Sequence, residues 1–114
     1  MKKLTNTNAS ILTLRQELQQ RSTETALRLS RSVGRAASVD LLPCTEYAQE
    51  VAAQHRLAEE LLFLQHCRAA LERAVDKGGS QLLWRWQRGG STQVRFRRQN
   101  NCLTMQVRQG KDMT

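Results

Sequence analysis

The chain has 114 residues, with 18 lysines and arginines against 10 aspartates and glutamates, which gives a formal net charge of +8. This length fits a single domain, and no apolar run approaches the roughly 18 residues of a membrane span. Lys2 and Lys3 are not followed by an apolar segment, which argues against a secretory signal. The three cysteines have no motif spacing, a pattern typical of a reducing compartment, so we expect a cytoplasmic protein.

The charge is distributed unevenly along the chain. Residues 1–40 carry seven basic and three acidic groups, residues 41–79 four and six, and residues 80–114 seven and one. The central segment is therefore mildly acidic and both flanks are basic. A field of this kind attracts polyanions, which include nucleic acid, acidic proteins and anionic membranes. We expect nucleic acid or an acidic protein as the partner and no membrane, because the first helix offers a poor insertion surface without Trp or Phe.

The first element that we expect is helical and covers residues 9–37. Apolar and small residues recur there at helical spacing: Ile11, Leu14, Leu18, Thr25, Leu29 and Ala36. Ser22 and Thr23 interrupt this stripe, so either one helix with a weak middle or two shorter helices would fit. Arg28, Arg31 and Arg35 share one face, either as a solvated surface or as a surface that contacts phosphate.

The second expected helix, over residues 45–77, is the longest uninterrupted pattern in the chain. Pro43 precedes it, Gly78 and Gly79 follow it, and neither residue type occurs inside it. Its apolar stripe consists of Leu57, Leu61, Leu64, Leu71 and Val75, with Arg68 in the one gap. This stripe predicts either a core-facing helix surface or the seam of a homodimer. The short connection between the two helices predicts that they are antiparallel neighbours.

Beyond Gly79 the periodicity changes from helical to alternating, which predicts a three-stranded antiparallel meander over residues 81–108. The apolar positions are Leu82, Trp84, Trp86, Val94, Phe96, Leu103, Met105 and Val107. Such a sheet needs a cover on its apolar face. We therefore predict an α+β fold in two layers, with the antiparallel helical pair packed on the meander. Residues 1–114 form one domain, in which 1–8 and 110–114 are flexible ends.

The polar face of this sheet is the sharpest functional signal. It carries Arg85, Arg95, Arg97 and Arg108 among amides and hydroxyls, with Arg88 and Arg98 at the turns and no acidic residue on any strand. Guanidinium groups match phosphate oxygens and guanine edges. Three explanations fit this face: contact with nucleic acid, docking of an acidic protein, or solvated protection of strand edges against aggregation.

Catalytic and metal-binding patterns are poorly represented in the sequence. His55 and His66 lie three helical turns apart, too far to share one ion, and Cys44 and Cys102 have no ligand near them in sequence. We therefore predict a non-enzymatic protein without metal or cofactor. The leading hypothesis is a small nucleic-acid-binding or regulatory protein, acting on DNA or RNA through the arginine face. The alternative is an adaptor or inhibitor that docks an acidic partner protein.

Overall fold

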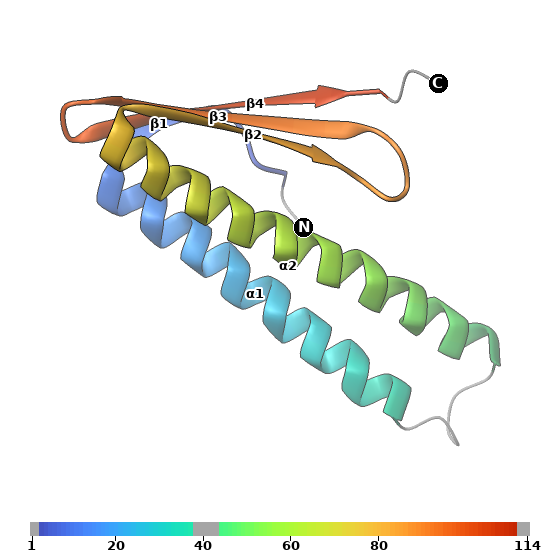
Figure 1. Cartoon of the computed structure of the whole chain (residues 1–114). Coiled ribbons are helices and arrows are strands. Elements are labelled where there is room, and N and C mark those ends of the chain that lie inside the picture. Colours follow the sequence, from blue (N-terminus) through green and yellow to red (C-terminus); the bar gives the residue numbers. More distant parts are fainter. Residues whose placement is uncertain (1–2, 38–43, 112–114) are drawn as a thin grey trace.

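The computed structural model describes residues 3–37 and 44–111, in which two helices pack against one side of a four-stranded antiparallel sheet (Figure 1). In chain order the elements are β1 (Thr7–Ser10), α1 (Ile11–Ala37), α2 (Cys44–Lys77), β2 (Gly79–Arg85), β3 (Ser91–Gln99) and β4 (Cys102–Gly110). The predicted α+β class is confirmed. The expectation for the connection at residues 38–43 lies outside the described residues.

The predicted number of strands is wrong, because the chain contributes a further strand before the first helix. The strand order is β1-β4-β3-β2, with β1 antiparallel to β4 and Thr7 opposite Met105. Just before β1, Leu4 is only 8% exposed and belongs to the core. The sequence of β1 lacks the alternation of apolar and polar residues that would predict a strand, although its burial alternates in the structure. The exposed edge of β4 therefore selects this strand, since a sheet edge offers unpaired backbone groups.

Helix α1 continues through the serine and threonine residues that interrupt its apolar stripe. The hydroxyl of Ser22 donates to the carbonyl oxygen of Leu18 at 2.9 Å, so this buried polar group finds its partner within the helix. Leu14 and Leu18 are buried as predicted. Of the two alternatives, a single helix is the correct one.

Helix α2 ends where the sequence indicates, and the end is tied to the sheet. Gly78 has a φ of 91° and donates its N–H to the carbonyl oxygen of Ala74 at 2.8 Å. Positive φ favours glycine at this position of a helix terminus. Arg98 donates to the carbonyl oxygen of Val75 and, at 2.8 Å, to that of Asn100. The β3–β4 turn is thereby attached to the last turn of α2.

The core lies between the helices and the inner face of the sheet. Its largest fully buried side chains include Leu14, Leu18, Leu64, Leu71, Val94, Phe96, Leu103 and Met105. The ring of Phe63 contacts those of Trp84 and Trp86, with centroids 5.8 and 5.0 Å away. The alternation that assigned both tryptophans to the apolar face is therefore correct, although each keeps some of its surface in solvent.

The two helices run obliquely beneath the sheet, and their distance from it grows toward the C-terminal end of α1 and the N-terminal end of α2 (Figure 1). We call residues 11–21 and 59–77 the covered region and residues 22–37 and 44–58 the uncovered region. Every buried apolar helix residue belongs to the covered region of the described chain. The buried helix residues of the uncovered region are polar: Ser22, Thr25 and Ser32.

Candidate nucleic-acid interface

The side of the sheet that faces away from the helices, here the outer face, is formed by alternate residues of β2, β3 and β4. The pairing places Arg95 between Gln81 and Gln106, and Arg97 between Gly79 and Thr104. Arg108 lies opposite Gln93, one diagonal step from Arg95, and neighbours at that step are about 7–8 Å apart. Arg85 occupies the corner beside Ser91.

Arg85, Arg95, Arg97 and Arg108, here the outer arginines, are all exposed, so the predicted set is brought together on one surface. Within the described residues none of them forms an ion pair. The observed ion pairs join Arg15 to Glu72, Arg21 to Glu17 and Arg35 to Glu50, all in the helical layer. Acidic side chains of residues 3–37 and 44–111 therefore do not neutralise the positive charge of the outer face.

The two arginines predicted at the turns lie apart from this surface. The guanidinium carbon of Arg88 is 5.4 Å from the centre of the Trp86 ring, on the inner side of the β2–β3 turn. Arg98 is an inner-face residue of β3 and lies just beyond the end of α2. Its side chain donates hydrogen bonds there to the carbonyl oxygens of Val75 and Asn100. The contacts of Arg98 stabilise the fold, so this side chain is less available to a ligand than the outer arginines.

The predicted helix arginines also lie apart from the outer face. Arg28, Arg31 and Arg35 belong to the uncovered region of α1, in the layer that packs against the opposite side of the sheet. Arg35 is paired with Glu50, with Nε 2.7 Å from Oε1. This guanidinium, and then a hydrogen bond from Ser32, holds the pKa of Glu50 below its ordinary value. Arg28 and Arg31 remain exposed.

The helix stripe that predicted a homodimer seam contributes mainly to the core of one molecule. Leu64 and Leu71 are fully buried within the monomer, and Leu57, Leu61 and Val75 are half-buried. Leu64 and Leu71 are therefore not accessible to a second copy. On the side of α2 that faces α1, a groove remains open between the two helices.

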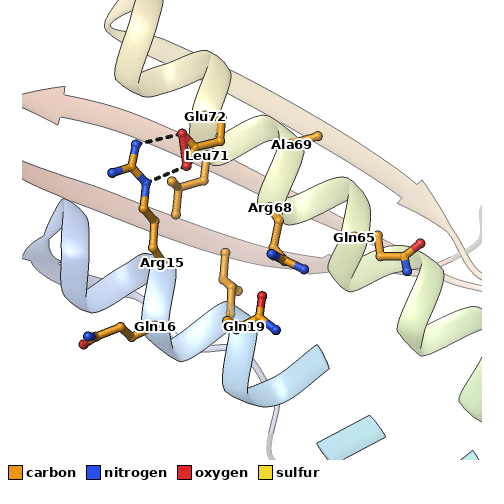
Figure 2. A pocket seen from close by; sticks show the side chains of 9 residues that line it. Arg15, Gln16, Gln19, Gln65, Arg68, Ala69, Leu71 and Glu72 are labelled. Atoms are coloured by element: carbon orange, nitrogen blue, oxygen red, sulfur yellow. Dashed lines mark hydrogen bonds and ion pairs between the residues drawn. The ribbon is translucent and has the colours of Figure 1, made fainter. Parts of the chain in front are cut away.

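This groove, shown in Figure 2, has a volume of about 490 Å³ and lies on the side of the helices away from the sheet. It is lined by Arg15, Gln16, Leu18, Gln19, Gln65, Arg68, Ala69, Leu71 and Glu72. Two hydrogen bonds of 2.6 and 2.8 Å join Arg15 to Glu72 and lower the pKa of that carboxyl group. Arg68, the gap in the stripe, points into the groove (Figure 2). No spacing in the sequence indicated this hollow.

The cysteine and histidine side chains of α2 were considered as nucleophiles or metal ligands. Cys67 is buried, which raises the pKa of its thiol to about 12 and makes it a poor nucleophile at neutral pH. The ring of His66 packs against Trp84, 5.3 Å between centroids. Across residues 3–37 and 44–111, no group of three or more His, Cys, Asp or Glu side chains could hold a metal ion. Neither helix, as far as the structure describes it, is long and apolar enough to cross a membrane.

Comparisons with known proteins do not assign a function. No protein-family model matches the chain, and neither the curated proteins nor the solved structures include a match. An α+β fold of two helices and four strands is compatible with many activities, since function resides in a particular site rather than in a fold. The outer face is the site that carries a distinctive chemistry here.

Proposed function

We propose that this chain is a small, non-catalytic nucleic-acid-binding or regulatory protein and that the outer face of its sheet is the binding surface. The observation that carries the proposal is the set of outer arginines, which are exposed and lack ion-pair partners within the described chain. Arginine forks bind phosphate oxygens in a bidentate manner. A surface with four such groups attracts the negatively charged backbone of a nucleic acid.

The protection of strand edges does not account for this surface. Charged residues placed to prevent aggregation are expected on strands whose backbone groups are unpaired. That explanation fits Arg85 on the edge strand β2. It does not fit Arg95 and Arg97, because β3 is paired on both sides. Arginines in the middle of a sheet face are better explained by a ligand that covers the face.

The surroundings of the outer arginines favour backbone contact over base stacking. The tryptophans face inward, and the neighbours on the outer face are mainly glutamines, such as Gln81 and Gln106. Phosphate contacts carry no sequence information, whereas amides can form hydrogen bonds to base edges. We therefore expect binding to many sequences with a steep salt dependence.

The test is a fluorescence anisotropy titration of random duplex DNA, single-stranded DNA and RNA across a series of salt concentrations. For duplex DNA the log–log slope changes by about −0.9 for each neutralised phosphate, so four contacts would give roughly −3.6. The double variant Arg95→Glu, Arg97→Glu should lose at least about tenfold in affinity and roughly two units of slope. Thermal melting should show an unchanged fold, because both side chains are exposed.

A matched control separates this surface from net charge alone. Arg28→Glu with Arg31→Glu makes the same change of charge on exposed residues of the uncovered region of α1. This control should reduce the affinity much less than the sheet variant. Equal losses in the two variants, or weak binding by the wild type, would contradict the proposal.

The alternative is docking of an acidic protein on the same face. The same arginines support it, since carboxylates are also bidentate partners of guanidinium groups. In that case nucleic acid would bind weakly. A defined partner, captured from lysate by the wild type and lost with Arg95→Glu, Arg97→Glu, would then identify the function.

A further inference from the structure

The two edges of the sheet differ in how well they are closed. The edge strand β1 has four residues, and beyond it the side-chain oxygen of Asn6 accepts the N–H of Val107 at 2.8 Å. The opposite edge strand, β2, has seven residues and contains neither proline nor lysine. Proline, lysine and short length are common devices that protect an edge. The edge of β2 has none of these three, and its one charged residue is Arg85 at the end of the strand.

The backbone groups that β2 leaves free can be identified from its hydrogen bonds. Gly78 accepts the N–H of Arg98 at 2.9 Å, and Trp86 donates to the carbonyl oxygen of Gly90 at 3.0 Å. Even-numbered residues between them therefore point their backbone groups toward β3, because these directions alternate along an antiparallel strand. Gly79, Gln81, Leu83 and Arg85 consequently direct their N–H and C=O groups away from the sheet. Among the described residues these groups have no hydrogen-bond partner.

Apolar side chains are exposed at this same edge on both layers. Leu83 is 57% exposed on the outer face, and Leu62 of α2 is 48% exposed. Glu59 and His66 of α2 both contact the side chain of Trp84. Leu62 follows Glu59 by three residues and precedes His66 by four, so all three lie on one side of the helix. Leu62 therefore lies below the free edge of β2.

We propose that β2 pairs with β2 of a second copy of this chain in an antiparallel, two-fold symmetric arrangement, forming a sheet that is continuous across the dimer. In such a pair, residues whose backbone groups point away from the sheet edge in one copy lie opposite residues of the same kind in the other copy. A two-fold axis at Leu83 satisfies this rule. It places Leu83 opposite its own counterpart and Gln81 opposite Arg85, so no two arginines face each other directly, as like charges there would destabilise the pair.

The choice of a second copy rests on this self-complementarity. Leu83 on the outer face and Leu62 in the helical layer are exposed at the same free edge, so one two-fold axis brings each leucine toward its own counterpart. Joined edges satisfy the free backbone groups of both copies, and contact between the leucines removes apolar surface from water.

The two-fold arrangement places the outer faces of both copies on the same side of the dimer, and the role of this joint surface rests on the proposed function. Residues opposite one another in a sheet project to the same side, so the axis is perpendicular to the sheet and both outer faces lie on one surface. The dimer would then present two sets of outer arginines to one nucleic acid. The pairing itself does not depend on that ligand.

Sedimentation equilibrium of three proteins tests the pairing. The wild type should be a dimer, with about twice the mass of one chain. Leu83→Lys should be a monomer, since it adds a charge opposite its own counterpart. Gln93→Lys is the matched control, because Gln93 lies opposite Leu83 on the same face but on the interior strand β3. It should remain a dimer. A monomeric wild type at about 100 µM, or a Leu83→Lys dimer, would overturn the proposal.

Cross-linking tests the register. In a background with the exposed Cys44 and Cys102 changed to serine, Leu83→Cys should form a disulfide-linked dimer on mild oxidation. Directly opposed residues that exchange hydrogen bonds have Cα atoms about 5.5 Å apart, within the range of a disulfide. Arg85→Cys should not cross-link, since it faces Gln81. The opposite pattern would overturn this register. A cross-linked dimer that does not bind nucleic acid would contradict the proposed function but support the pairing. A monomer that binds nucleic acid would support the proposed function but contradict the pairing.

Discussion

Under the sheet, α1 and α2 meet through leucines such as Leu14 and Leu71, which are almost inaccessible to solvent. Beyond the sheet the same two helices meet through Ser22, Thr25 and Ser32. The difference follows from the number of neighbours. In the covered region the sheet provides a third surface, so apolar side chains can be enclosed completely. In the uncovered region a pair of helices alone cannot enclose a large side chain.

Polar contacts replace apolar burial in the uncovered region. The hydroxyl of Ser32 donates to a carboxylate oxygen of Glu50 at 2.7 Å, and Gln54 donates to the carbonyl oxygen of Ser32 at 3.3 Å. Contacts of this kind align two helices but contribute less to stability than the burial of leucines. The uncovered region should therefore open more readily than the covered region.

The largest expected effect is the removal of a leucine from the covered region. Leu71→Ala should lower the free energy of unfolding by about 2–5 kcal/mol, because it leaves a cavity in a closed core. Leu29→Ala is the matched substitution in the uncovered region, where Leu29 is half-buried. It should cost only about 1 kcal/mol. Urea denaturation followed by circular dichroism measures both values, and similar losses would contradict the distinction.

Native cysteines provide a second probe of the two regions. Cys44 is exposed at the start of α2, in the uncovered region, and Cys67 is buried in the covered region with its thiol pKa raised to about 12 by desolvation. With a thiol reagent at about pH 7.5, Cys44 should react at once, and Cys67 at least about tenfold more slowly, until denaturant is added. Mass spectrometry of labelled peptides gives both rates. Rapid labelling of Cys67 in the folded protein would show that the core opens easily.

The smallest expected effect is the pH dependence of the Arg35–Glu50 contact. Arg35 and Ser32 lower the pKa of Glu50 from its ordinary value of 4.5 in the folded protein. The carboxylate therefore contributes stability above that value and loses it as the pH falls through the lower folded pKa. Glu50→Gln should melt slightly below the wild type at about pH 7, and the gap should close below about pH 4. A gap independent of pH would mean that this charge is irrelevant.

Much of the architecture could be predicted from local patterns. Helical spacing identified both helices, and alternation between polar turns identified β2, β3 and β4 with their inner and outer faces. The same alternation placed the outer arginines together. These features are local because side-chain direction in a helix or strand depends on residue period alone.

The remaining features depend on neighbours that lie far away in the chain. β1 is a strand because the edge of β4 accepts it, and Arg98 belongs to the fold because the end of α2 lies within its reach. Leu64 and Leu71 lie in the core rather than in a dimer seam, because one molecule already covers them. A stripe of leucines predicts that one side of a helix is buried. Which element packs against that side is determined by the tertiary structure.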